Sequence, residues 1–240
     1  MARKRKKSNI PSWALILLAL AVLLCRWFFE NGQENCDPAE SVAHAISVDQ
    51  VPAYSESPYV VINDGKPLFQ DDDLTTKSYE YYGELDDLGR CTITMACIGK
   101  DLMPTEDRGN ISSVKPTGWV QNFYETVDGG ALYNRCHLIG FQLTGENANK
   151  ENLITGTRYM NVEGMLPFEN KVAGYVRQTG NHVLYRVTPI FKGDELVARG
   201  VQLEAYSVED DGAGVCFHVY VYNVQPGIVI DYATGENYEG

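Results

Sequence analysis

One histidine in the sequence lies in a context that suits acid–base chemistry. His137 comes two residues after Arg135 and precedes a polar segment, 144–152, that is rich in asparagine and glycine. A neutral imidazole can act as a general base on water, and a nearby guanidinium can bind a phosphate or offset the charge that develops on it. The pattern therefore predicts attack of water on an anionic ester. The chain's other histidines offer no comparable context and are expected to be structural: His44, His182 and His218.

Hydrolysis of a phosphodiester also requires a hard cation near the leaving oxygen, and oxygen ligands hold such a cation. Asn161 and Glu169, on the helical segment expected after the histidine, are candidate ligands. Taken alone, both residue types are ordinary on a helix surface. The acidic clusters at 71–73 and 84–87 are interpreted as solvated loop ends, because they lack the spacing of an EF-hand loop.

The segment around His137 carries a resemblance to a known family. The stretch Tyr133–Gly140, with the sequence YNRCHLIG, resembles the Asp-Arg-Gly-His motif of the DNA/RNA non-specific endonucleases. These are the ββα-metal, or His-Me finger, nucleases, and they include streptococcal surface and secreted DNases. Further similar segments follow the family order, so that the resemblance covers roughly 57–240: residues 115–119, 151–153, 185–188, 223–227 and 231–236.

The resemblance implies a role for each residue near the base. His137 corresponds to the general base that deprotonates water for in-line attack on phosphorus. Arg135 is the arginine of the motif, and Arg108 matches an upstream phosphate-binding arginine. Asn152 matches an asparagine close to the base in the streptococcal members, where it holds the site together.

The resemblance also implies a metal site. Asn161 corresponds to the one direct protein ligand of a largely hydrated Mg²⁺, and Glu169 to the acid that supports its water shell; Mn²⁺ is a candidate substitute. On an unbroken α-helix these two residues would lie about 12 Å apart along the axis and about 80° apart around it. Gly164 and Pro167 interrupt the segment between them.

Two positions depart from the family motif. Asn134 stands where many members have aspartate, and it can accept a hydrogen bond but cannot act as an anion. Cys136 stands where many members have glycine, so the backbone there must accommodate a Cβ. Neither change removes a catalytic group.

The pattern of apolar residues predicts the elements that position this site. Strand patterns precede and follow one helical stretch, between Thr157 and about Gln178, and a long irregular loop spans Met103–Trp119. The expected buried stripe of the helix is Phe168, Val172, Tyr175 and Val176. The predicted fold is therefore α+β, with a central antiparallel sheet and a ββα-metal catalytic motif. Strands are expected in Tyr59–Gly65, Cys91–Ile98, His182–Phe191, Val201–Val208, Cys216–Val224 and Ile228–Tyr232.

The N-terminus has the pattern of an export signal. Five basic residues within 3–7 precede an uninterrupted apolar run, Trp13–Cys25. No small-x-small cleavage site follows, which favours an uncleaved signal anchor over 1–29 with the remainder outside the cytoplasm; the chain would be secreted if the leader were cleaved. The polar segment 30–56 is interpreted as a linker, and 57–240 as the endonuclease domain.

The cysteines exclude two kinds of site. No CxxC pair occurs, so neither a zinc ribbon nor a thioredoxin motif is present. Cys91 and Cys97 would lie about 20 Å apart on a straight strand, too far for a disulfide. Two alternatives stay open for the cysteines: a disulfide that involves Cys36, or free thiols that are buried at separate places.

The distribution of charge limits how the chain can bind nucleic acid. The net charge is −12, but 1–29 holds six basic and no acidic residues, which leaves −18 on residues 30–240. This negative charge excludes the class of proteins that coat nucleic acid through bulk positive charge. An enzyme that releases its product can confine positive charge to one groove, for which Arg108, Lys115, Arg135 and Arg158 are the candidates.

Three functions are compared on this basis. The first is an anchored, extracytoplasmic, Mg²⁺-dependent endonuclease that cuts DNA without sequence preference, with RNA left open as a second substrate. The second is a surface nucleic-acid-binding or uptake component with little or no catalysis, suggested by the two altered motif positions and the charge of −18. The third is an envelope domain that binds protein.

Overall fold

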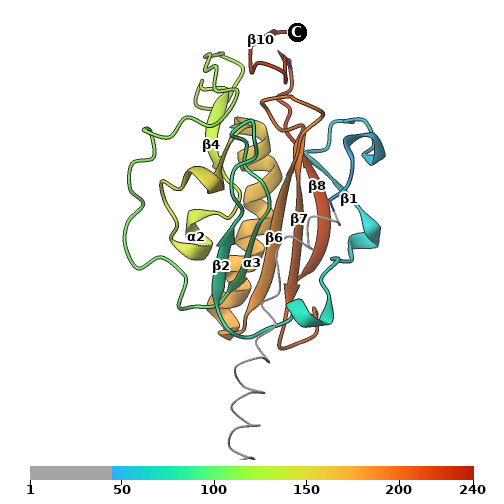
Figure 1. The fold of residues 1–240 in the computed structure, drawn as a ribbon, viewed down its shortest axis with the longest axis vertical. Helices are drawn as coiled ribbons and strands as arrows, with labels where there is room; N and C mark the ends of the chain where they lie inside the picture. Colours follow the sequence, from blue (N-terminus) through green and yellow to red (C-terminus); the bar gives the residue numbers. More distant parts are fainter. Residues whose placement is uncertain (1–44) are drawn as a thin grey trace, which may run out of the picture. The chain divides into compact units, whose positions relative to one another are not determined.

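The computed structural model describes residues 45–240, which lie within one compact unit. Their largest element is a six-stranded antiparallel sheet with the strand order β1-β8-β7-β6-β3-β2 (Figure 1). The strands of this sheet are β1 (Tyr59–Val61), β2 (Tyr79–Tyr82), β3 (Thr94–Ile98), β6 (Val183–Ile190), β7 (Gly200–Ser207) and β8 (Cys216–Tyr222). The predicted α+β fold with a central antiparallel sheet is confirmed.

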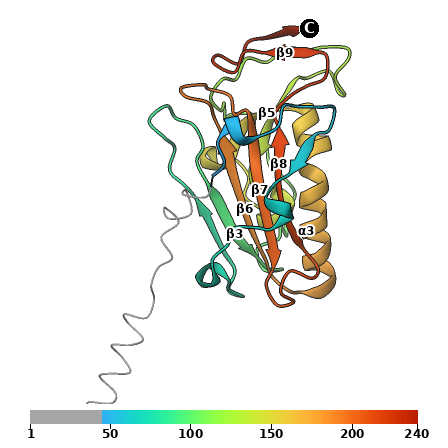
Figure 2. The same ribbon diagram turned by 90° about the vertical axis from the view of Figure 1, so that its right-hand side faces the viewer.

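One face of the sheet packs against helix α3 (Leu166–Thr179), as Figure 2 shows. Period-two alternation sends Phe217, Val219 and Val221 of β8 into the core with this helix. The helix contributes Val172 and Val176, which are fully buried, while Phe168 and Tyr175 pack at the edge of the same core. The predicted buried stripe of the helix is therefore confirmed.

The other face of the sheet is covered by the chain that leads into β1. Tyr220 and Tyr222 of β8 lie in a separate apolar cluster with Val48, Val51 and Tyr54. Residues 46–54 fall within the predicted linker, yet they contact the sheet. Burial on both faces explains why β6 reads as a nearly continuous apolar run. The domain boundary at residue 57 stays a prediction.

A second, two-stranded sheet carries the segment that resembles the family motif. Strand β4 (Tyr133–His137) pairs with β5 (Leu153–Thr157), so that His137 lies opposite Leu153. Strand β5 leads into the π-helix η6 (Met160–Met165), which continues directly as α3. The order strand, strand, helix is the predicted ββα arrangement. Between β4 and β5 lie the short helix α2 (Phe141–Thr144) and the 3₁₀ turn η5 (Lys150–Asn152).

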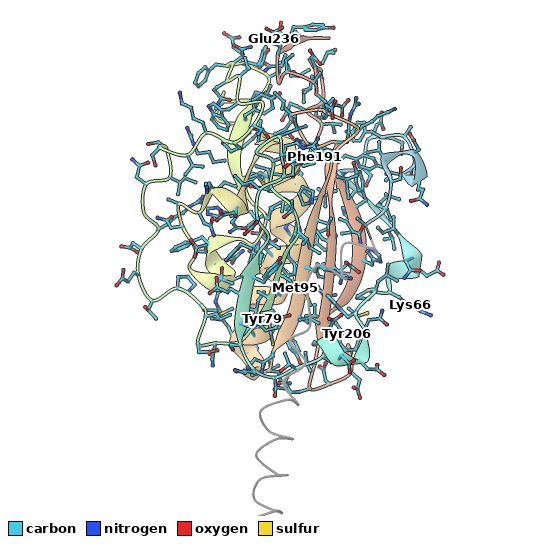
Figure 3. The ribbon with its side chains drawn as sticks, viewed as in Figure 1. Lys66, Tyr79, Met95, Phe191, Tyr206 and Glu236 are labelled. Atoms are coloured by element: carbon cyan, nitrogen blue, oxygen red, sulfur yellow. The ribbon has the colours of Figure 1, made fainter. Side chains whose placement is uncertain are left out.

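Short elements complete the described chain. The hairpin of β9 and β10 lies at the C-terminal end of the chain, and Figure 3 labels Glu236 beside its turn. Figure 3 also shows Tyr79 and Met95 near each other on β2 and β3, where they belong to one small apolar cluster. The remaining bounds are β9 (Ile228–Ile230), β10 (Asn237–Glu239) and the 3₁₀ turns η2 (Val48–Gln50), η3 (Asn63–Gly65) and η4 (Asp71–Asp73).

Three of the sequence predictions concern the ends of the chain and its cysteines. The predicted signal anchor, 1–29, and residues 30–44 of the linker lie outside the described residues. Across 45–240, no helix combines the length and apolar composition needed to cross a membrane. The cysteines of this part of the chain are all free: Cys91, Cys97 and Cys136 are buried and Cys216 is exposed.

Candidate active site

The predicted catalytic segment opens onto a cavity of about 460 Å³. The cavity is bounded by β4, the start of α2, the η6–α3 junction and the loop that precedes β4. Six of the eight predicted site residues line it: Arg108, Arg135, His137, Arg158, Asn161 and Glu169. Residues separated by 61 positions in the sequence therefore meet in one place.

The hydrogen bonds of His137 define which ring nitrogen can act as a base. Nε2 lies 2.8 Å from the backbone oxygen of Asn147, and a carbonyl oxygen can only accept, so Nε2 carries the hydrogen. In the neutral ring, Nδ1 then keeps its lone pair. Arg108 Nη2 donates to this Nδ1 at 3.1 Å. The histidine is thus held in one tautomer, with its basic nitrogen toward the guanidinium that lines the cavity.

The surroundings of His137 keep it neutral. The side chain is almost fully buried, and burial lowers the pKa of His137 to about 4, with the Arg108 guanidinium acting in the same direction. The hydrogen bond to Asn147 opposes this shift. At neutral pH the imidazole is therefore unprotonated and able to accept a proton.

The two arginines nearest the histidine are bound differently. Arg108 is exposed and faces the histidine. Arg135 donates from Nε to the backbone oxygen of Val114 and from Nη2 to that of Ser112, and its guanidinium lies 4.3 Å from the centre of the Trp119 ring. Arg135 therefore ties the long loop to β4 through two of its five N–H donors. Arg108 is the more exposed of the two cations.

Asn161 reaches the cavity from the π-helix. A π-turn takes more residues than an α-turn, so less rotation accumulates between Asn161 and Glu169 than on a regular helix. The separation of about 80° around the axis, which holds for a regular α-helix, therefore does not apply to these two residues. Both side chains line the same cavity. The thiol of Cys136 donates to Asn161 Oδ1 at 3.0 Å and thereby orients the amide.

Glu169 presents a buried carboxylate. Burial raises the pKa of Glu169 to about 7, while Arg108 and Gln142 act in the opposite direction. No ion pair involving Glu169 is found within residues 45–240. The backbone of Gly140 comes so close that a Cβ there would lie 2.4 Å from Glu169 Oε2. This glycine leaves room for the carboxylate at the cavity wall.

The other predicted residues lie at different depths. Asn152 is fully buried and does not line the cavity; its amide accepts from the backbone nitrogen of Ile139 and donates to the Ile139 oxygen. It therefore fixes the chain just after the histidine. Arg158 lines the cavity but donates to Asp128 through Nε and Nη2. Lys115 is exposed and lies outside the lining.

The sequence does not predict several other residues of the site. Asn147 acts through its backbone oxygen, which no sequence pattern could reveal. Trp119 and Gly140 lie within the segments that resemble the family, and that resemblance was the available signal. Gln121 lines the cavity and holds the start of β4 by donating to the Tyr133 oxygen and accepting from the Tyr133 nitrogen. Nothing in its local sequence marks it.

Comparison with known families explains this combination of fold and side chains. Residues 70–209, more than half of the chain, match the family described as DNA/RNA non-specific endonuclease. The chain belongs to this family. The match includes β2 to β7 and all eight predicted site residues. The resemblance noted in the sequence is thereby confirmed.

Individual relatives agree with the family. A deoxyribonuclease from Streptococcus dysgalactiae subsp. equisimilis is 35% identical over 109 residues, 43% of this chain and 32% of the relative. The match thus spans about a third of that relative's length. Among solved structures, NucA from Streptococcus agalactiae with a magnesium ion bound has a TM-score of 0.70 and 25% identity, covering 81% of this chain and 92% of its own.

A second solved nuclease structure is also similar to this chain. The Sda1 nuclease with a bound zinc ion has a TM-score of 0.63 and 26% identity, covering 77% of this chain and 97% of its own. The fold of the described residues is therefore that of the streptococcal ββα-metal nucleases.

Proposed function

We propose that this family member is a metal-dependent endonuclease that hydrolyses phosphodiester bonds of DNA without sequence preference. The observation that carries the proposal is a single cavity lined by a neutral histidine of defined tautomer, an amide oxygen, a buried carboxylate and an exposed arginine. These groups match the needs of hydrolytic attack on a phosphate. The curated relative's printed name, deoxyribonuclease, supports DNA as the substrate, and RNA stays open.

His137 is the proposed general base. Water attacks the phosphorus as Nδ1 of His137 takes one of its protons, and the bond from phosphorus to the departing oxygen breaks in line with the attack. The Asn147 oxygen holds Nε2–H, which keeps Nδ1 available. Arg108, exposed and next to Nδ1, is placed to bind the phosphate and offset its charge.

Asn161 and Glu169 are the proposed metal-binding residues. One amide oxygen and one buried carboxylate that forms no ion pair within residues 45–240 suit a hard, oxygen-seeking cation. Within residues 45–240, no three His, Cys, Asp or Glu side chains are grouped to hold a metal. A cation with few protein ligands keeps most of its water, which favours Mg²⁺. When bound, it would neutralise charge on the phosphate and on the leaving oxygen.

The solved relatives bear on the choice of metal. The NucA structure contains magnesium and the Sda1 structure contains zinc. We propose Mg²⁺ as the working ion here, with Mn²⁺ able to replace it. Zinc prefers nitrogen and sulfur ligands in a tetrahedral site, and the cavity residues offered to the ion are oxygens.

The site supports cleavage without sequence preference because its groups address the phosphate. His137 and Arg108 need only the phosphodiester, which every nucleotide shares. Arg108, Arg135 and Arg158 line the cavity, whereas residues 30–240 as a whole carry −18, so binding is expected to be weak and sensitive to salt.

We further propose that residues 1–29 anchor the protein in the membrane and that the endonuclease domain lies outside the cytoplasm. The support is the sequence pattern of basic residues followed by an apolar run. Protease added to intact cells should digest the domain that carries His137. Survival of that domain until the cells are lysed would contradict the proposed orientation.

Cleavage of plasmid DNA tests the proposed activity. The full-length protein, kept in detergent, is expected to degrade plasmid with Mg²⁺ or Mn²⁺ and to stop when EDTA is added. The variants His137→Ala and Asn161→Ala should each lose the activity, with a circular dichroism spectrum like that of the wild type. Filter retention of DNA without cleavage under any divalent ion would favour the uptake component instead. Neither cleavage nor retention would favour the protein-binding domain.

A further inference from the structure

An exposed aromatic ring lies in the loop that borders the active-site cavity. Phe123 is 73% exposed, the largest exposed fraction among the large hydrophobic side chains of the described residues. It lies in the loop before β4, close to the β9–β10 hairpin at the end of the molecule where Figure 3 labels Glu236. The ring is absent from the apolar clusters of residues 45–240 and makes no aromatic or cation–π pair there.

The backbone directs Phe123 to the cavity side. Phe123 forms an isolated antiparallel bridge with Ala131, which lines the cavity, and bridged residues place their Cβ atoms about 5 Å apart on the same face. Two positions earlier, Gln121 also lines the cavity. In an extended segment residues i and i+2 share a face.

The side chains of the two residues next to Phe123, Asn122 and Tyr124, bond to strand β10. Asn122 donates to Oδ1 of Asn237 on β10 at 3.0 Å, and the Tyr124 hydroxyl donates to the same oxygen at 2.6 Å. Two neighbours of Phe123 are thus fixed to the β9–β10 hairpin. Alternation along the extended segment places the Phe123 ring on the opposite face from these two side chains, the face shared with Gln121.

Hydrogen bonds within the loop hold the backbone on both sides of Phe123. The backbone nitrogen of Tyr124 donates to the Gly130 oxygen at 2.8 Å, and that of Leu132 donates to the Asn122 oxygen at 3.1 Å. Arg158, itself in the cavity lining, donates to Asp128 of the same loop. Because its backbone is already held, ordering this exposed ring against a planar group costs less entropy than it would on a loop without such hydrogen bonds.

We propose that Phe123 is a base-stacking subsite that accepts an unpaired nucleobase next to the phosphate held in the cavity. The inference rests on the proposed nuclease function and adds a preference for single-stranded or locally unpaired nucleic acid. Aromatic side chains stack on any base, so such a contact strengthens binding without reading sequence. In an intact duplex the bases are stacked on one another and cannot reach the ring, so duplex gains less from it.

Arg135 and Trp119 explain why Phe123 is the available ring. The Trp119 face is already covered by the Arg135 guanidinium, 4.3 Å from the ring centre. Tyr133, also in the lining, is 2% exposed. Phe141, the remaining aromatic residue of the lining, is half-buried. Phe123 is therefore the most exposed ring near the cavity.

The test measures binding separately from cleavage. In full-length His137→Ala protein, a short single-stranded oligonucleotide carrying one 2-aminopurine should bind with quenching of its fluorescence, because stacking quenches this base analogue. Adding Phe123→Ala should remove the quenching and weaken binding about tenfold, within the range expected for one stacked base. Adding Phe123→Trp should restore both. Val61→Ala, at an exposed apolar site on β1, should change neither.

A second comparison separates stacking from a general loss of affinity. Replacing the 2-aminopurine with an abasic site should weaken binding to the Phe123 protein but add little to the Phe123→Ala defect. The ratio of single-strand to duplex affinity should fall in Phe123→Ala. Equal losses on intact and abasic strands, or on single strand and duplex, would overturn the subsite. Failure of the wild type to cleave any DNA would instead count against the proposed function, whatever the binding results.

Discussion

Arg108 Nη2 lies 3.1 Å from His137 Nδ1, the nitrogen that must accept a proton during hydrolysis. The opposite nitrogen, Nε2, is bound to the Asn147 oxygen, so the guanidinium covers the only lone pair of the ring. Arg108 is exposed and can move toward an anion. Charge-assisted bonds to phosphate are stronger than a bond to a neutral imidazole. Substrate binding would therefore draw the arginine to the phosphate and uncover the base in the same step.

This relationship predicts two separate effects of Arg108→Ala. Loss of the phosphate contact should lower kcat/KM by about 30-fold, the value of one strong charged hydrogen bond. Loss of the nearby cation should also raise the pKa of His137, because the guanidinium acts to lower it. An NMR titration of the metal-free protein measures the second effect directly.

Arg108→Lys provides the matched control. It keeps the positive charge but loses the planar fork, so the pKa of His137 should stay low while kcat/KM recovers only in part. An unchanged pKa of His137 in Arg108→Ala would contradict the electrostatic coupling. Unchanged kcat/KM in that variant would show that Arg108 does not bind the phosphate.

The sequence predicts which side chains form this site better than it predicts the contacts that those side chains make. Sequence context marks His137, and the family resemblance assigns roles to it and to the candidate ligands Asn161 and Glu169; all three line one cavity. Their geometry depends on the π-helix, and no residue pattern distinguishes five-residue from four-residue hydrogen bonding along a helix. The sequence likewise predicts Arg135 as a phosphate ligand. In the structure its Nε and Nη2 donate to loop carbonyls, and these contacts carry no sequence signature.

Gly140 allows a test of the carboxylate at the proposed metal site. Its backbone has φ −61° and ψ 143°, which alanine adopts readily, so Gly140→Ala adds only a Cβ. That atom would lie 2.4 Å from Glu169 Oε2, and the carboxylate must therefore move. The Mn²⁺ affinity, followed by electron paramagnetic resonance, is expected to fall about tenfold, an energy of about 1.4 kcal/mol.

Gly174 supplies the control for this variant. A Cβ at Gly174, in α3, meets nothing within 4 Å. Gly174→Ala should leave metal binding unchanged and raise the free energy of unfolding by about 0.5–1 kcal/mol, because alanine favours helix. If Gly140→Ala bound Mn²⁺ as tightly as Gly174→Ala, the role of Glu169 in metal binding would be rejected.

Cys136 and Gly156 form a compensating pair on the ββα unit. A Cβ at Gly156 would lie 2.7 Å from Cys136 Cβ and 3.2 Å from its Sγ. The cysteine that replaces the family's glycine on β4 is thus accommodated by a glycine on β5. Gly156→Ala alone should lower the free energy of unfolding by about 1–3 kcal/mol through overpacking.

Adding Cys136→Gly should recover much of that loss. The predicted coupling between the two substitutions is about 1 kcal/mol or more, obtained from urea denaturation of both single variants and the double variant. Strict additivity would disprove the steric account. Cys136→Gly also removes the hydrogen bond to Asn161 Oδ1, so the double variant should bind Mn²⁺ less tightly than the wild type even where its stability recovers.

The segment before β1 illustrates a second limit of sequence interpretation. The lack of periodicity in residues 46–54 predicts a linker, yet Ile46, Val48, Val51 and Tyr54 pack in the cluster of Tyr220 and Tyr222. Irregular chain can cover a sheet with isolated apolar residues, and periodicity detects only regular elements. Strand β2 was missed for a related reason, since its four residues are too few to establish alternation.

The burial of His137 predicts a pH dependence of stability. In the unfolded chain the imidazole binds a proton below its ordinary pKa of about 6.5, whereas in the folded chain its pKa is about 4. The unfolded state therefore gains the proton first, and this contribution to stability is complete above pH 6.5 and lost as the pH falls to 4. The loss amounts to at most about 3 kcal/mol.

Glu169 contributes with the opposite sign. Its folded pKa of about 7 exceeds the ordinary carboxyl value of 4.5, so the folded state binds the proton first as the pH falls. The two terms partly cancel in the wild type, and only a difference between proteins isolates the histidine. Urea unfolding in EDTA should show wild type losing stability relative to His137→Gln between pH 6.5 and 4. Parallel stability curves would mean that His137 is not kept neutral by the fold, and would remove the basis for its role as a base poised at neutral pH.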